Sequence, residues 1–296
     1  MRVIFIGCVE FSFFTLNQLL SLKLNGSEVV GVITKKKSMI NSDHCSLAPL
    51  ADAAGIPTLY ADENDKNDIC KWIKDKKPDV IFCFGWSHLL TKDILEIPPL
   101  GVVGYHPAEL PKNRGRHPII WALVLGLKQT ASTFFIMDEG ADTGPILSQV
   151  CVKINDGDDA SSLYKKLGSV AKKQIAEFMP MLINGKYETR SQDHLKANYW
   201  RKRNKEDGKI DWRMSASSIN NLVRALTKPY PGAHCNYMNS EVKIWKTELI
   251  QSVPINYEPG KVLECDNGKP IIKCGSGAIR IISHEFITLP EKGEYI

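Results

Sequence analysis

Two polar residues near the middle of the chain are of the types that acid–base chemistry needs. His106 ends the apolar run GVVGYH and is followed by Pro107, so it stands where a strand gives way to a loop. Asp142 lies between two glycines in the later loop GADTG. A buried carboxylate facing a histidine can orient the ring and stabilise the imidazolium, while the other ring nitrogen handles a substrate proton. The pair predicts acyl transfer or hydrolysis.

The patterns that would add a covalent nucleophile or a metal ion to this pair are missing from the sequence. There is no G-x-S-x-G, no helical His/Glu metal motif, and no P-C-x-x-C to accompany His106 and Glu109. No cysteine stands in an obviously electropositive turn. The predicted chemistry is therefore direct attack of an external nucleophile on an activated acyl group, without a metal.

An alternation of strand and helix signals in the first half would position these residues. Apolar, β-rich runs at 2–6, 28–34, 56–60 and 78–86 are separated by helical patterns at 10–24, 46–55 and 62–77. This alternation predicts an α/β fold with a Rossmann-like, doubly wound, mostly parallel sheet. Ligands bind beyond the carboxyl ends of such strands, so His106 and the 138–144 loop mark the expected site. Neither G-x-G-x-x-G nor the P-loop pattern occurs, so the topology implies neither a dinucleotide nor ATP.

The amino-acid composition changes near residue 190. A long amphipathic helix is predicted over 161–185, and a polar, charge-rich stretch follows it. Short β-like pieces with Gly and Asn-Gly turns then indicate a small β-barrel. We expect a catalytic domain over 1–190, a linker over 191–212 and a β-barrel domain over 213–296.

Composition places the chain among ordinary globular proteins. Its 296 residues are 43% hydrophobic and 24% charged, which suits a real core and excludes a disordered or fibrous chain. No apolar segment reaches the roughly 18 residues of a membrane span, and the eight cysteines form no C-x-x-C pair. We expect a cytoplasmic protein without disulfides or zinc. The net charge of +5 fits either a solvated basic surface or attraction of an anionic substrate.

The residues around the pair also resemble a known family. HPAELPKNRGRHPIIWAL followed by TASTFFIMDEGADTGPILSQ is similar to the signature of the formyltransferases that use 10-formyltetrahydrofolate, whose members act on methionyl-tRNA, glycinamide ribonucleotide or nucleotide sugars. MRVIFIGCVEFSFFTLNQLL resembles the family's opening strand and helix, and KEDGKIDWRMSASSINNLVRAL resembles the start of its C-terminal domain. The resemblance implies the formyltransferase fold, an OB-like C-terminal barrel and 10-formyltetrahydrofolate as cosubstrate.

The same resemblance implies roles for particular residues. His106 and Asp142 would be two of three catalytic residues, for attack of a primary amine on the formyl carbon. The pterin would lie against two loop segments and be recognised largely by backbone groups. Its implied contacts are Phe84, Gly85, Trp86, Leu89, Asp138, Glu139, Gly140, Ala141 and Asp142.

One position departs from the family pattern. Where the family has an Asn whose side chain donates a hydrogen bond to the formyl oxygen, this chain has Gly104. Loss of one such donor costs about 3 kcal/mol in the barrier. We expect compensation by a water in the space left by the side chain, by a backbone N–H, or by Asn113 or Ser132. A catalytically dead relative is the alternative.

The identity of the amine is a separate question. The 34–50 loop is shorter than the basic loop of the tRNA enzymes, and GCVEFS and FCFGWSHLL look more like nucleotide-sugar N-formyltransferases. The resemblance favours a UDP- or dTDP-linked 4-amino-4,6-dideoxyhexose, made for surface polysaccharide or nonulosonic acid synthesis. Arg114, Arg224 and Lys228 are candidate anion contacts, and Tyr230 is a candidate contact to the sugar or base.

Two other functional hypotheses stay open. The first is a methionyl-tRNA formyltransferase, because the basic run at 35–37 could bind the polyanionic tRNA, although tRNA is the less favoured substrate. A noncatalytic folate- or RNA-binding relative would use the barrel and RKRNK as a basic surface, but the barrel strands lack a regular aromatic platform for stacking bases. A homodimer is compatible with the resemblance.

Overall fold

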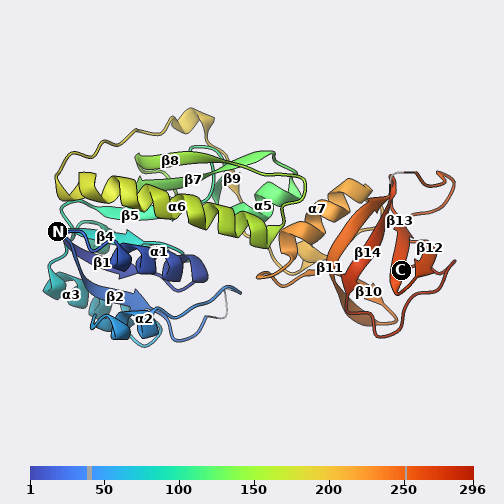
Figure 1. Cartoon of the computed structure of the whole chain (residues 1–296), viewed down its shortest axis with the longest axis horizontal. Helices are drawn as coiled ribbons and strands as arrows, with labels where there is room; N and C mark the ends of the chain where they lie inside the picture. Colours follow the sequence, from blue (N-terminus) through green and yellow to red (C-terminus); the bar gives the residue numbers. More distant parts are fainter. Residues whose placement is uncertain (39–41, 251) are drawn as a thin grey trace. The chain divides into compact units, whose positions relative to one another are not determined.

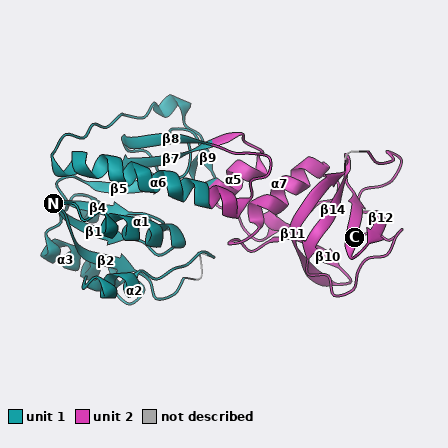
Figure 2. Ribbon diagram, viewed as in Figure 1, with its two compact units in different colours: residues 1–118, 130–152, 165–200 teal, residues 119–129, 153–164, 201–296 magenta. Residues whose placement is uncertain are grey.

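The chain forms two compact units in a computed structural model that describes residues 1–38, 42–250 and 252–296 (Figures 1 and 2). Unit 1 comprises residues 1–118, 130–152 and 165–200, and unit 2 comprises residues 119–129, 153–164 and 201–296. Residues 191–200 of the expected linker therefore belong to unit 1, and 201–212 to unit 2. Within the 34–50 loop, residues 39–41 lie outside the described part of the chain.

Unit 1 is built on a seven-stranded sheet with the order β3-β2-β1-β4-β5-β7-β8 (Figure 1). Its strands are β1 (Arg2–Ile6), β2 (Glu28–Thr34), β3 (Thr58–Tyr60), β4 (Val80–Cys83), β5 (Val102–His106), β7 (Gln129–Ile136) and β8 (Ile146–Lys153). The first five run parallel to one another, and β7 pairs antiparallel with β5. The predicted mostly parallel, doubly wound sheet is confirmed.

Helices cover both faces of this sheet. They are α1 (Glu10–Ser21), α2 (Ala48–Ala53), α3 (Lys66–Lys76), α4 (Lys92–Leu95) and the long α6 (Ala160–Ile183). Successive side chains of a strand point to opposite faces. On β4, Phe82 packs against Phe178 of α6 with ring centroids 6.2 Å apart, whereas Ile81 and Cys83 join Ile73 of α3 in the other layer. Among the described helices, none is both long and apolar enough to cross a bilayer.

Strand β4 ends before the end of its apolar run. The sequence predicts a strand over 78–86, but the pairing stops at Cys83. Gly85 has φ of +66°, a left-handed conformation that favours glycine, and a Cβ there would lie 2.2 Å from Val9 Cγ2. The turn carries the segment from Trp86 onward to the carboxyl edge of the sheet.

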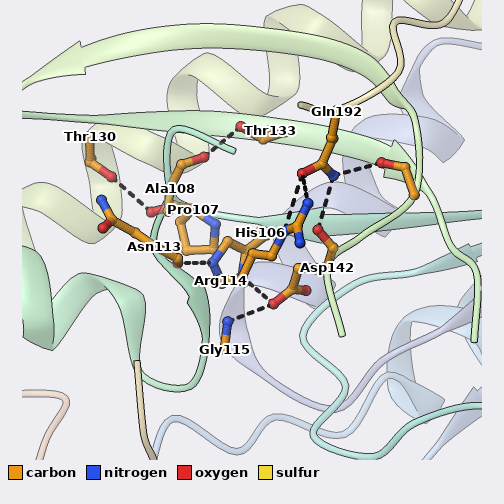
Figure 3. Close-up of polar contacts among 11 residues, drawn as sticks. His106, Pro107, Ala108, Asn113, Arg114, Gly115, Thr130, Thr133, Asp142 and Gln192 are labelled. Carbon is orange, nitrogen blue, oxygen red and sulfur yellow. Dashed lines mark hydrogen bonds and ion pairs between the residues drawn. The ribbon is translucent and has the colours of Figure 1, made fainter. Parts of the chain in front are cut away.

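The loop after β5 is anchored to β7 (Figure 3). Thr130 Oγ1 donates to the carbonyl of Pro107 at 2.9 Å, and Thr133 Oγ1 donates to the carbonyl of Ala108 at 2.6 Å. Both threonines are buried. Because buried carbonyls need partners, these bonds hold the chain that leaves His106 in one path.

Unit 2 contains a five-stranded antiparallel sheet with the order β10-β11-β14-β13-β12. Its strands are β10 (Ala233–Tyr237), β11 (Ser240–Ile250), β12 (Val262–Asp266), β13 (Lys269–Lys273) and β14 (Ala278–His284). Helix α7 (Ala216–Leu226) packs against it through one apolar face that includes Ile219 and Leu222. The predicted short strands are confirmed as a C-terminal antiparallel sheet. The remaining elements are β6 (Arg114–Gly115), α5 (Pro118–Val124), η1 (His194–Lys196), β9 (Tyr199–Trp200) and η2 (Glu206–Gly208).

Candidate active site

His106 is the last residue of β5, and its side chain lies almost wholly out of solvent, at 4% exposed. Its Nε2 is 2.7 Å from the carbonyl oxygen of Asn113 (Figure 3). A carbonyl can only accept, so Nε2 must carry the hydrogen in this bond. The lone pair of the neutral ring is therefore on Nδ1.

Asp142 faces that basic nitrogen. Its Oδ2 is 3.5 Å from His106 Nδ1 and accepts a 2.9 Å hydrogen bond from the backbone N–H of Gly115. We expected the nitrogen turned away from the acid to handle a substrate proton, and this expectation was wrong because Nε2 is committed to Asn113. Nδ1 is the atom that can accept a proton, and Asp142 then stabilises the imidazolium directly.

The loop that carries Asp142 is tightly built. Asp138 Oδ1 accepts hydrogen bonds from the Gly140 N–H, at 3.1 Å, and from Thr143 Oγ1. A Cβ on Gly144 would lie 1.8 Å from the carbonyl oxygen of Ile136, so only glycine permits this approach. These contacts fix the position of the carboxylate.

Gln192 connects this loop to Arg114, and sequence analysis did not identify it. Gln192 Nε2 donates to the carbonyls of Asp142 and Gly144 at 2.9 and 2.6 Å, while its Oε1 accepts from Arg114 Nη2 at 2.7 Å (Figure 3). The side chain is 7% exposed. A glutamine within a charge-rich stretch carries no periodic signal of burial. The aromatic pair Tyr199–Trp200 was the one hint that this stretch folds.

Arg114, a candidate anion contact in the sequence, is a buried cation whose partners lie within the protein. Its side chain is 1% exposed and donates to Gln192, to the Tyr199 hydroxyl at 2.9 Å, and toward His194 Nδ1 at 3.2 Å. Because these guanidinium N–H groups are bonded within the protein and buried, they are not accessible for a bidentate contact to a diphosphate. The strands around it, β6 and β9, pair parallel.

Gly104 does not leave an open space. In the register of the sheet it lies opposite Phe135, and a Cβ on Gly104 would be 2.9 Å from Phe135 Cζ and 2.8 Å from Met137 Cγ. Those two side chains fill the volume that an Asn would take. The expected water in a vacated space is therefore contradicted.

Of the two side chains considered as substitutes, Ser132 has its donor committed. Ser132 is fully buried, and its Oγ donates to the Tyr105 hydroxyl at 3.2 Å. Tyr105 is buried as well, and burial raises the pKa of its hydroxyl. Asn113 Oδ1 accepts from Asn198 Nδ2 at 3.2 Å. Of the compensations that we considered, these contacts leave a backbone N–H and the amide N–H groups of Asn113 unaffected.

The residues expected to contact a folate divide into two groups. Phe84 is fully buried in the aromatic layer, its N–H donates to Ile6, and its carbonyl accepts from Ser12 Oγ, so it presents no group to a ligand. The others lie in the segments after β4 and β7, and Leu89 is 64% exposed. Their accessible members are Gly85, Trp86, Leu89, Asp138, Glu139, Gly140, Ala141 and Asp142.

The three candidate contacts from the second half all lie in unit 2. Arg224 Nη1 donates to the carbonyl of Asp158 at 2.9 Å, and burial lowers its pKa from the usual value. Lys228 is exposed and lies 5.9 Å from the centroid of the Trp245 ring, and Tyr230 is half-buried. Throughout the residues that the structure describes, no group of three or more His, Cys, Asp or Glu side chains could hold a metal ion.

Comparison with known proteins gives a consistent result over both units. The model of the formyl transferase family matches residues 1–179, and that of the formyl transferase C-terminal domain matches residues 202–288. The chain is 34% identical to a methionyl-tRNA formyltransferase of Caldanaerobacter subterraneus subsp. tengcongensis over 287 residues, which are 95% of this chain and 91% of the relative.

Two further proteins are similar. A bifunctional polymyxin resistance protein ArnA of Wigglesworthia glossinidia brevipalpis is 37% identical over 232 residues, which are 78% of this chain and 35% of that protein. Among solved structures, an N-formyltransferase of Helicobacter canadensis in complex with folinic acid and dTDP-3-aminofucose superposes with a TM-score of 0.73 at 20% identity. That alignment covers 96% of this chain and 100% of the other.

The packing around Gly104 predicts a cost for any added side chain. Gly104→Ala should lower the free energy of unfolding by about 1–3 kcal/mol, because its Cβ meets Phe135 and Met137. Met137→Ala should make room, so the double variant should lose less than the sum of the two single losses, measured by urea denaturation. A neutral Gly104→Ala would show that the space is open after all.

The contacts of Gln192 predict a second, larger effect. Gln192→Ala should lower the free energy of unfolding by about 2–3 kcal/mol, because it leaves buried Arg114 and two loop carbonyls short of partners. The matched control is Gln18→Ala, because Gln18 is a half-buried glutamine of α1. This variant should change the free energy of unfolding by under about 0.5 kcal/mol. Equal stability of the two variants would contradict the connecting role of Gln192.

Proposed function

Because the chain belongs to the formyl transferase family, we propose that it moves the formyl group of 10-formyltetrahydrofolate to the primary amine of a nucleotide-linked amino sugar. The observation that carries the proposal is the His106–Asp142 pair. A nitrogen lone pair and a carboxylate meet 3.5 Å apart at the carboxyl edge of the sheet, in a site with little exposure to water.

The pair suits the proton transfer that acyl transfer to an amine requires. An amine that attacks the formyl carbon must lose a proton, and His106 Nδ1 can accept it as a general base. Asp142 Oδ2 then pairs with the imidazolium, while Nε2 stays bonded to Asn113. His106 can return the same proton to the leaving nitrogen. One N–C bond forms, one C–N bond breaks, and the proton count balances.

The two accessible loops fit a folate cosubstrate, which supplies the formyl carbon and the leaving nitrogen when bound. Both segments have partly exposed backbone, at Gly85 and at Ala141, and Leu89 presents an exposed apolar surface for a pterin. The Helicobacter canadensis protein, which shares this fold, was crystallised with folinic acid. We propose that a backbone N–H of these loops donates to the formyl oxygen in place of the absent Asn.

A nucleotide sugar is the favoured acceptor. The similar Helicobacter canadensis structure contains dTDP-3-aminofucose. Part of the basic run that could attract tRNA is neutralised here, because Lys36 Nζ lies 2.7 Å from Glu63 Oε1. We extend the proposal to a UDP- or dTDP-linked 4-amino-4,6-dideoxyhexose. The 34% identity to a methionyl-tRNA formyltransferase supports methionyl-tRNA as the second candidate.

A substrate panel tests the proposal. Purified protein with 10-formyltetrahydrofolate should add the mass of one formyl group to a dTDP- or UDP-linked 4-amino sugar, detected by mass spectrometry. His106→Ala should slow transfer about 10²–10⁴-fold, because the general base is lost. His284→Ala is the matched control, because His284 Nε2 also forms a hydrogen bond with a backbone carbonyl, that of Gly268. This variant should leave the rate of transfer unchanged. Transfer to methionyl-tRNA alone would replace the sugar with the second candidate.

A further inference from the structure

Three nitrogen-bearing side chains meet around residues 86–88, outside the contacts already described. Lys35 Nζ lies 3.0 Å from His88 Nε2 and 4.9 Å from the centroid of the Trp86 ring. Arg116 Nη1 donates to the carbonyl of Ser87 at 2.6 Å. The cluster therefore joins the end of β2, the segment after β4 and the turn after β6, all within unit 1.

The cluster offers donors and no acceptor. An ammonium can only donate, so His88 Nε2 must accept from Lys35, which leaves the hydrogen of the neutral ring on His88 Nδ1. Further N–H groups remain on Lys35 and on the guanidinium of Arg116. A set of donors with two positive charges is suited to an oxyanion.

The positive charge of the cluster is not neutralised by a contacting acid. In the described part of the chain, neither Lys35 nor Arg116 forms an ion pair. Asp62, the acid beside this segment, uses its oxygens on the backbone N–H groups of Lys36 and Lys37. Burial, and then the charges of Lys35, Arg116 and Lys66, hold the pKa of His88 below its usual value.

The cluster also borders the catalytic pair. Arg116 directly follows Gly115, whose N–H binds the Asp142 carboxylate at 2.9 Å. The backbone N–H of Arg116 is itself held by the carbonyl of Trp200 at 3.0 Å, so the base of this side chain is fixed. A substrate whose anionic group binds at this cluster could therefore place its reacting group beside His106.

We propose that Lys35, His88 and Arg116 form an oxyanion site that anchors the charged part of a substrate beside His106 and Asp142. The inference rests on the proposed function, since both of its substrates carry such groups. The diphosphate of a nucleotide-linked sugar and the glutamate carboxylates of the folate present the same chemistry, and binding measurements can distinguish them.

Equilibrium binding tests the site without any turnover. The probes are dTDP, 5-formyltetrahydrofolate, and 5-formyltetrahydropteroate, which has the same ring system without the glutamate. Lys35→Met and Arg116→Met should each weaken binding of one anionic probe by about tenfold or more, measured by isothermal titration calorimetry. Lys37→Met removes the same charge two residues from Lys35 and should change affinity by less than about twofold.

The outcomes separate the two sources of the anion. Weaker dTDP binding with unchanged folate binding assigns the site to the diphosphate. Weaker binding of 5-formyltetrahydrofolate but not of the pteroate assigns it to the glutamate. Circular dichroism checks that both variants are folded. Wild-type binding with no loss in either variant would overturn the site while leaving the proposed function standing. Wild-type protein that binds neither dTDP nor the folate would overturn both.

Discussion

The hydrogen bond from His106 Nε2 to the carbonyl of Asn113 decides which nitrogen of the imidazole is basic. A backbone carbonyl cannot change its role with pH, so the tautomer is set by the path of the main chain and not by a titrating partner. That path is in turn held by the bonds of Thr130 and Thr133 to the loop after β5. Asp142 faces a nitrogen lone pair only because Nδ1, and not Nε2, carries it.

The carboxylate side of the pair depends on a second set of contacts. Gln192 ties the Asp142 loop to Arg114, a cation that is almost fully removed from solvent. Burying an arginine is costly unless its donors are satisfied, and here neutral oxygens and a ring nitrogen satisfy them. Gln192, near the start of the expected linker, is thus part of unit 1. The backbone of Gly115, beside Arg114, also holds the Asp142 carboxylate.

The sequence predicted the features that depend on local pattern. Central parallel strands are buried on both faces, so β1 and β4 appear as uninterrupted apolar runs. His106 was expected at the carboxyl end of a strand, and it is the last residue of β5. Features that depend on tertiary packing were not predictable. Which side chains fill the space beside Gly104 is decided by the cross-strand position of Phe135. The family resemblance placed Phe84 at a ligand, but strand alternation turns its side chain into the core.

The tautomer of His106 in the free protein can be measured directly. Nitrogen-15 NMR of the imidazole, assigned by comparison with His106→Gln, distinguishes a protonated ring nitrogen from one with a lone pair. We expect neutral His106 to carry its hydrogen on Nε2 and a lone pair on Nδ1, facing Asp142. A neutral ring with the hydrogen on Nδ1 would contradict this expectation, because Asp142 would then hold a donor and the nitrogen bonded to Asn113 would have none to give.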